Sequence, residues 1–130
     1  MDTRTLGRTH RTVSAIALGT WELGADWGEV TETDARAVLD ASAEAGVTLF
    51  EHAPLYGGCM SETRTGEVLS TVPRDSFRIA TKVGRLLVPN EPGERVEDSI
   101  FEDVPALHPV FDFSADGVHR IRCSNRCRKK

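Results

Sequence analysis

The first half of the chain alternates short extended runs with stretches of helical spacing. Residues 4–6 and 13–18 are extended in character, and the Gly-Arg-Thr of residues 7–9 between them is typical of a turn. This predicts a β-hairpin that leads into a buried strand ending at Gly19. A helix is then expected, because Thr31 with Asp34 resembles a capping box and the chain reaches Gly46 after four apolar positions on one side, Ala35, Val38, Leu39 and Ala45.

The same alternation continues as far as residue 83. Residues 48–53 predict a short strand, and Ser61 is expected to cap a second helix that ends near Ser70, before Pro73. A third strand is expected over residues 77–83, with one face formed by Phe77, Ile79, Thr81 and Val83.

This order of elements predicts parallel strands joined by right-handed crossovers. Thr20, Glu51 and Lys82 follow one another at intervals of 31 residues, each at the C-terminal end of an expected strand, where an α/β barrel keeps its active site. A doubly wound sheet would share the order, but neither glycine-rich nucleotide motif follows any strand. The predicted fold is α/β: the N-terminal part, about three βα units, of a (β/α)8 TIM barrel preceded by a β-hairpin.

The regularity stops between residues 84 and 112. Four of the six prolines lie in this stretch, which is therefore expected to be a long loop. His108 lies there between prolines, and a loop position is preferred for it over a strand-end catalytic position at about three to one. Residues 114–118 could open a third helix, although no apolar stripe follows them.

Composition restricts the class of protein. With 130 residues and 39 % hydrophobic content, the chain can form one modest core. No apolar run is long enough to cross a bilayer and no secretion signal is visible, so a soluble cytoplasmic protein is expected. All 20 acidic residues precede residue 118, whereas the last thirteen residues carry six Lys or Arg and no acid.

Three polar residues at the strand ends could carry chemistry. Reducing a carbonyl group by hydride transfer needs a proton donor, and a tyrosine whose pKa is lowered from about 10 by a cation can be that donor. Tyr56 could be this proton donor and Lys82 the cation, and the carboxylate of Glu51 could hold the Lys82 ammonium in place. Taken singly, each also has a plain explanation as a loop aromatic, a solvated cation or an exposed carboxylate.

Four blocks resemble, in order and spacing, the first three barrel units of aldo-keto reductases: residues 18–21 (LGTW), 50–57 (FEHAPLYG), 61–62 (SE) and 81–84 (TKVG). The resemblance covers roughly residues 3–118, and residues 81–89 and 110–117 are most similar to the branch that oxidises free aldose sugars at C1. The domain prediction is accordingly a partial barrel over residues 1–118 and a non-homologous basic tail over residues 119–130.

The resemblance implies a tetrad of Asp, Tyr, Lys and His around a bound nicotinamide, NADP(H) or NAD(H), with a small carbonyl compound or sugar as substrate. Tyr56 would be the general acid or base and Lys82 the cation beside it. Gly19, Thr20 and Trp21 would line the nicotinamide and substrate pocket.

Two residues depart from the family pattern. Glu51 stands where the family has Asp, and the extra methylene would move the carboxylate by about an ångström, a displacement that can cost about 100-fold in rate. His52 replaces a Thr. The fourth tetrad member, the His, is expected beyond the end of this chain. A weakly active or inactive truncated chain, poorly folded or self-associating, is therefore predicted.

The end of the chain allows several explanations. Cys123 and Cys127 with His119 make a poor zinc site, so no metal is expected. The basic residues could contact nucleic acid, but a solvated tail is preferred, and a lost reading frame after residue 118 is the favoured hypothesis. A non-catalytic interaction protein derived from the same fold is the alternative to an enzyme, and a nucleic-acid binder is a less favoured one.

Overall fold

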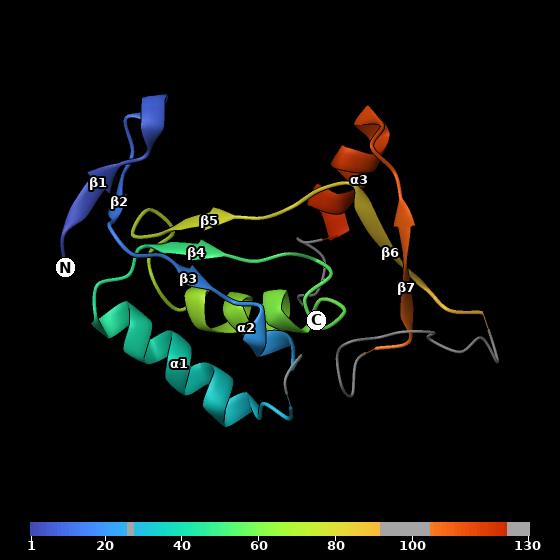
Figure 1. The fold of residues 1–130 in the computed structure, drawn as a ribbon, viewed down its shortest axis with the longest axis horizontal. Coiled ribbons are helices and arrows are strands. Elements are labelled where there is room, and N and C mark those ends of the chain that lie inside the picture. Colours follow the sequence, from blue (N-terminus) through green and yellow to red (C-terminus); the bar gives the residue numbers. More distant parts are fainter. Residues whose placement is uncertain (26–27, 92–104, 125–130) are drawn as a thin grey trace.

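A computed structural model describes residues 1–25, 28–91 and 105–124 of the chain (Figure 1). It opens with the predicted hairpin, in which β1 (Thr3–Thr5) pairs antiparallel with β2 (Thr12–Ser14) across the 3-10 turn η1 (Gly7–Thr9). The expected strand over residues 13–18 is wrong as a single element, because β2 ends at Ser14 and β3 covers only Leu18–Gly19. The backbone N–H of Ser14 instead donates to Thr48 Oγ1 at 2.8 Å, and the N–H of Thr48 donates to Ser14 Oγ at 2.9 Å.

The central feature is a parallel sheet of three strands in the order β3-β4-β5, with β4 at Leu49–Glu51 and β5 at Arg78–Ala80. Gly19 pairs with Glu51, and Glu51 pairs with Ala80, so the register advances by 32 and then 29 residues instead of a constant 31. Lys82 consequently lies two residues beyond β5. All three residues nevertheless lie at the C-terminal end of the sheet, as predicted: Glu51 ends β4, and Thr20 and Lys82 come just after β3 and β5.

Two helices cover one face of this sheet (Figure 1). Helix α1 (Glu32–Glu44) begins as predicted, because the Thr31 side chain accepts a hydrogen bond from the N–H of Asp34. Its predicted apolar side is correct for Ala35 and Leu39, which are buried, and wrong for Val38 and Ala45, which are exposed. Helix α2 spans Met60–Leu69.

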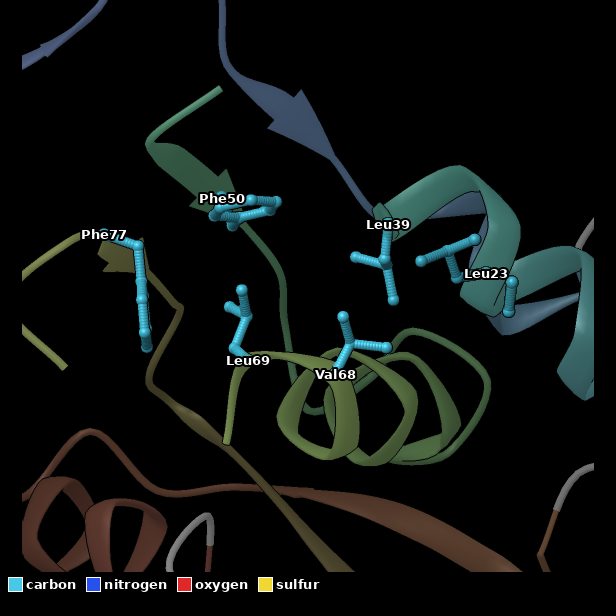
Figure 2. Packing of buried hydrophobic residues seen from close by; sticks show 7 residues of the cluster. Leu23, Leu39, Phe50, Val68, Leu69 and Phe77 are labelled. Atoms are coloured by element: carbon cyan, nitrogen blue, oxygen red, sulfur yellow. The ribbon is translucent and has the colours of Figure 1, made fainter. Parts of the chain in front are cut away.

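The core lies between the sheet and these helices, and Figure 2 shows its larger side chains directed toward one another. Phe50 of β4, 1 % exposed, meets Phe77 edge to face with the ring centroids 6.5 Å apart. Leucine and valine side chains from α1, α2 and the turn after β3 complete the cluster: Leu23, Leu39, Val68 and Leu69. The predicted apolar face of residues 77–83 is only partly buried. The strand expected over residues 77–83 is shorter than predicted, because β5 spans only Arg78–Ala80, and both Ile79 within it and Val83 beyond it are exposed.

The proline-rich stretch is not a plain loop. Strand β6 (Arg85–Pro89) and strand β7 (Leu107–Phe111) form an antiparallel ribbon, in which Leu87 lies opposite Pro109. A two-stranded ribbon tolerates proline, since each strand needs hydrogen-bonding partners on one side only. The expectation of a loop is therefore wrong for these two segments, whereas residues 92–104 lie outside the described part.

Helix α3 (Ala115–Ser124) confirms that a third helix opens after Ser114. It continues across the boundary predicted at residue 118, and Ile121 is 1 % exposed, so the structure has no break at that position. Residues 125–130, among them Cys127, lie outside the described part. No helix in the described ranges is long and apolar enough to span a membrane.

Candidate active site

The three predicted catalytic residues converge beyond the C-terminal end of the sheet. The Lys82 ammonium donates to the Tyr56 phenol oxygen at 2.6 Å and also pairs with the carboxylate of Glu51. The Tyr56 hydroxyl lies 3.2 Å from Glu51 Oε1. The longer side chain of Glu51 therefore does not prevent the carboxylate from reaching its two partners.

The position of Tyr56 is fixed by the start of α2. The N–H of Met60 donates to the carbonyl of Gly57 at 3.0 Å, and the N–H of Ser61 to that of Tyr56 at 3.3 Å. The helix therefore begins on the carbonyls of the Tyr56 loop, and its N-cap is Cys59, in a left-handed conformation with φ 76°. The prediction that Ser61 caps this helix is wrong.

A glycine contact holds the same loop from the other side. A Cβ atom on Gly24, in the 3-10 turn η2 (Glu22–Gly24), would lie 2.6 Å from the backbone nitrogen of Gly57 and 2.8 Å from the carbonyl carbon of Tyr56. Gly57 itself has φ +58°. The two backbones can approach this closely only because both residues lack side chains.

Ser61 instead belongs to a buried polar pair. Its Oγ donates to the carbonyl of Thr20 at 2.7 Å, and Thr20 Oγ1 lies 2.7 Å from the same hydroxyl oxygen. Both side chains are 0 % exposed. The pair joins the end of β3 to α2, and its full burial leaves the Thr20 side chain no surface for a ligand.

The other two predicted pocket residues differ in their surroundings. Trp21 packs on Tyr56 with ring centroids 4.9 Å apart and lines the cavity described below. Gly19 lies beside Glu51, since a Cβ atom there would be 3.8 Å from Glu51 Oε2, but it is not among the residues that line the cavity.

A second polar cluster lies behind the site. His52, 7 % exposed, places Nδ1 at 2.7 Å from Glu62 Oε1, but among the described residues this nitrogen makes no hydrogen bond. Thr81 donates to the same carboxylate oxygen at 3.1 Å. The carbonyl of His52 lies 3.5 Å from Lys82 Nζ. Residues that follow β4 and β5 are thus tied to α2, whereas the sequence had marked His52 only as a replacement for Thr.

Burial raises the pKa of Tyr56 above 10.0, and the carboxylate of Glu22 raises it further. Partial burial lowers the pKa of Lys82 from 10.5 in spite of the neighbouring Glu51 carboxylate. The expected lowering of the Tyr56 pKa is therefore wrong. Because Glu51 balances the charge of Lys82, burial dominates, and Tyr56 is a protonated phenol at neutral pH.

A cavity of about 310 Å³ opens beside the phenol. Its walls come from the ends of the sheet, from the Tyr56 loop and from the ribbon: Trp21, Ala53, Pro54, Leu55, Tyr56, Lys82, Val83, Arg85, Phe111 and Phe113. Sequence reasoning missed the last three because they follow the regular part of the chain. The alternation of Phe111 and Phe113 was the available signal.

His108 lies in β7 and is not in a loop. It pairs with Val88, and its Nδ1 lies 3.0 Å from Asn90 Oδ1. It does not line the cavity at Tyr56. Within the described ranges no group of three or more His, Cys, Asp or Glu could hold a metal ion, and Cys127 of the predicted poor zinc site lies outside those ranges.

Comparison with known proteins decides the family, because residues 15–105 match the description "Aldo/keto reductase family". The chain belongs to the aldo/keto reductase family. The resemblance stated from the sequence is thereby confirmed. Two solved family structures share the fold: an aldo-keto reductase from Bacillus halodurans in its holo form, with TM-score 0.70 and 25 % identity over 96 % of this chain, and a glycerol dehydrogenase from Gluconobacter oxydans, with TM-score 0.65 and 27 % identity over 98 %. The match covers 35 % of each of those chains.

Curated aldo-keto reductase relatives have several activities. A pyridoxal 4-dehydrogenase from Microbacterium luteolum is 38 % identical over 90 % of this chain, and a D-threo-aldose 1-dehydrogenase from a Pseudomonas species is 36 % identical over 82 %. This aldo-keto reductase chain spans about a third of their length, 36 % and 33 % respectively. The partial match is consistent with the predicted fragment of a (β/α)8 barrel.

Proposed function

We propose that this chain provides the proton-transfer centre of a nicotinamide-dependent oxidoreductase that interconverts a carbonyl group and an alcohol. The observation that supports this most strongly is the 2.6 Å contact between Lys82 Nζ and the Tyr56 phenol oxygen, with Glu51 bound to both residues. A proton donor held beside an open cavity is what the reduction of a carbonyl oxygen requires.

In this mechanism the phenol of Tyr56 donates its proton to the substrate oxygen as negative charge develops there. Lys82 holds the phenol oxygen and stabilises the phenolate that remains, because its ammonium hydrogen bond strengthens as the acceptor gains charge. Glu51 keeps the ammonium in place. In the reverse direction the Tyr56 phenolate accepts the alcohol proton.

The residues present fit a nicotinamide at this position. When bound, NADP(H) or NAD(H) would supply or accept the hydride. Trp21 gives the cavity a flat aromatic wall against the Tyr56 ring, which suits a planar ring. Gly19 and Thr20 would act only through their backbone at the end of β3, since the Thr20 side chain is fully buried.

Small carbonyl compounds or aldose sugars are the proposed substrates, as the names of the dehydrogenase relatives suggest. The rate of the 130-residue chain is expected to lie far below the usual range of about 1–1,000 per second. The reason is that the chain spans only about a third of the length of those relatives.

The test is nicotinamide oxidation by the purified chain with small aldehydes, measured with NADPH and NADH separately. We expect slow turnover that is lost in Tyr56→Phe, because the variant keeps the ring and removes the proton. Glu67→Gln, a change of an exposed residue on α2, is the control and should keep the full rate. Equal rates for the unchanged chain and Tyr56→Phe, including no turnover by either, would contradict the proposal.

A further inference from the structure

The cavity beside Tyr56 has a second aromatic wall, which the proposed proton and hydride transfer does not require. Trp21 and Tyr56 form one wall, and the exposed rings of Phe111 and Phe113, stacked with centroids 6.1 Å apart, form part of the other. Aromatic walls of this kind favour a flat ligand. The cavity measures only about 310 Å³, so a substrate that shares it with a nicotinamide ring is expected to carry no more than one ring.

Two cationic side chains, Lys82 and Arg85, line the cavity, and they differ in whether a carboxylate pairs with them. Lys82 is compensated by the carboxylate of Glu51. The Arg85 guanidinium carbon lies 5.1 Å over the centre of the Phe111 ring, and among the described residues no carboxylate pairs with it. A guanidinium stacked on a ring keeps its N–H groups available for hydrogen bonding and is pre-organised for a planar anion.

We propose that the site selects aromatic carbonyl substrates that carry a carboxylate, with Arg85 binding the carboxylate and Tyr56 facing the carbonyl group. This inference rests on the proposed function and adds the substrate class. Arg85 is a specificity residue in this account, and it takes no part in proton transfer. The carboxylate is expected at the Arg85 end of the cavity, because Glu51 already neutralises the other cation, Lys82.

Binding can be tested without cofactor or turnover, by calorimetric titration of the chain with benzoate and with the neutral isostere benzamide. We expect benzoate to bind more tightly. Arg85→Gln should weaken benzoate binding about tenfold, the loss typical of a charge-assisted hydrogen bond, and leave benzamide unaffected. Arg85→Lys should recover part of the loss because it keeps the charge but not the planar fork.

The chain offers a matched control in Arg74, whose guanidinium carbon lies 4.8 Å over the Phe77 ring and outside this cavity. Arg74→Gln should leave the ratio of benzoate to benzamide affinity unchanged. Equal affinities of the unchanged chain for both probes, or a ratio that Arg85→Gln does not alter, would overturn the inference.

A turnover arm separates this inference from the proposed function. 4-Carboxybenzaldehyde should be preferred over 4-formylbenzamide in kcat/KM, mainly through KM, and Arg85→Gln should abolish the preference. Arg85-dependent binding of benzoate without Tyr56-dependent turnover would support the anion site and contradict the proposed function. Tyr56-dependent turnover with no preference for the carboxylate would support the proposed function and contradict the anion site at Arg85.

Discussion

The two walls of the cavity are built in different ways. The wall at Tyr56 rests on buried contacts, among them the Thr20–Ser61 pair and the Gly24–Gly57 approach. The wall from the ribbon presents Phe111 and Phe113 at 63 % and 74 % exposed. The proton donor Tyr56, 7 % exposed, thus belongs to the part of the chain with dense packing, whereas the rings of the ribbon do not.

This difference separates stability from specificity. Local opening is least favourable where buried apolar contacts and hydrogen bonds are dense, so the Tyr56 wall should open only when the core does. The ribbon wall should tolerate substitution. Changes in the first wall are therefore expected to alter folding and kcat, and changes in the second to alter mainly KM.

The largest contrast is expected between Phe50→Ala and Phe111→Ala. Phe50 is 1 % exposed at the centre of the core, and its truncation should cost about 3–5 kcal/mol of unfolding free energy. The same change at exposed Phe111 should alter the unfolding free energy by no more than about 0.5 kcal/mol. Urea denaturation monitored by circular dichroism measures both values. Similar losses at the two positions would contradict the difference in packing between the two walls.

A smaller loss is expected at the glycine contact. Gly24→Ala should destabilise the chain by about 1–3 kcal/mol, because the new methyl group would meet the backbone of Gly57 and Tyr56. Gly66→Ala is the matched control. A Cβ atom on Gly66 in helix α2 would meet nothing within 4 Å, and alanine should stabilise that helix by about 1 kcal/mol. Denaturation midpoints that move in the same direction for both variants would refute the close approach.

The buried hydroxyl pair gives the next effect. Ser61→Ala should cost about 1–3 kcal/mol, since it leaves the hydroxyl of Thr20 without one of its two partners in a fully buried position. Ser70→Ala, at the exposed end of α2, is the control and should have little effect. Thermal unfolding compares the two variants, and equal shifts in melting temperature would show that the buried pair is unimportant.

The smallest effect concerns pH. Burial and then Glu22 raise the pKa of Tyr56, so the reduction should persist through neutral pH and fall as pH rises through that raised pKa, while alcohol oxidation rises over the same interval. The stability contributed by the protonated phenol is present below the unfolded pKa of about 10 and is lost as pH rises through the folded value. Glu22→Gln should lower the pKa of Tyr56.

Absorbance titration can follow this group alone, because the chain has one tyrosine. The tyrosinate midpoint should move to lower pH in Glu22→Gln and stay unchanged in Glu67→Gln. A midpoint that does not move in Glu22→Gln would exclude Glu22 as a cause of the raised pKa.

The sequence predicted the regular part of the fold because local signals agreed there. Thr31 caps α1 as expected, and the strand ends carry Glu51 and Lys82 to the same edge. The prediction failed where a tertiary contact decided the outcome. The hydroxyl of Ser61 is buried against Thr20 and therefore does not cap α2, and this burial leaves no sign in the local sequence.

The ribbon and the end of α3 were missed for related reasons. The number of prolines in this stretch indicated a loop, yet Pro89 and Pro109 both lie in a two-stranded antiparallel ribbon, which tolerates proline. Ile121 alone does not make an apolar stripe, and its burial depends on neighbours from other parts of the chain. Arg85 and Phe111, which line the cavity, come from this less regular region.

The convergence of Tyr56 and Lys82 is the central claim, and proton NMR tests it without cofactor or substrate. The single tyrosine gives unambiguous ring signals, and Lys82 Nζ lies 4.6 Å from the centre of that ring. Nuclear Overhauser effects are predicted between the Tyr56 ring and the terminal methylene of Lys82, alongside those between Phe50 and Phe77 as an internal reference. A spectrum with the Phe50–Phe77 contact and no contact between Tyr56 and Lys82 would contradict the account.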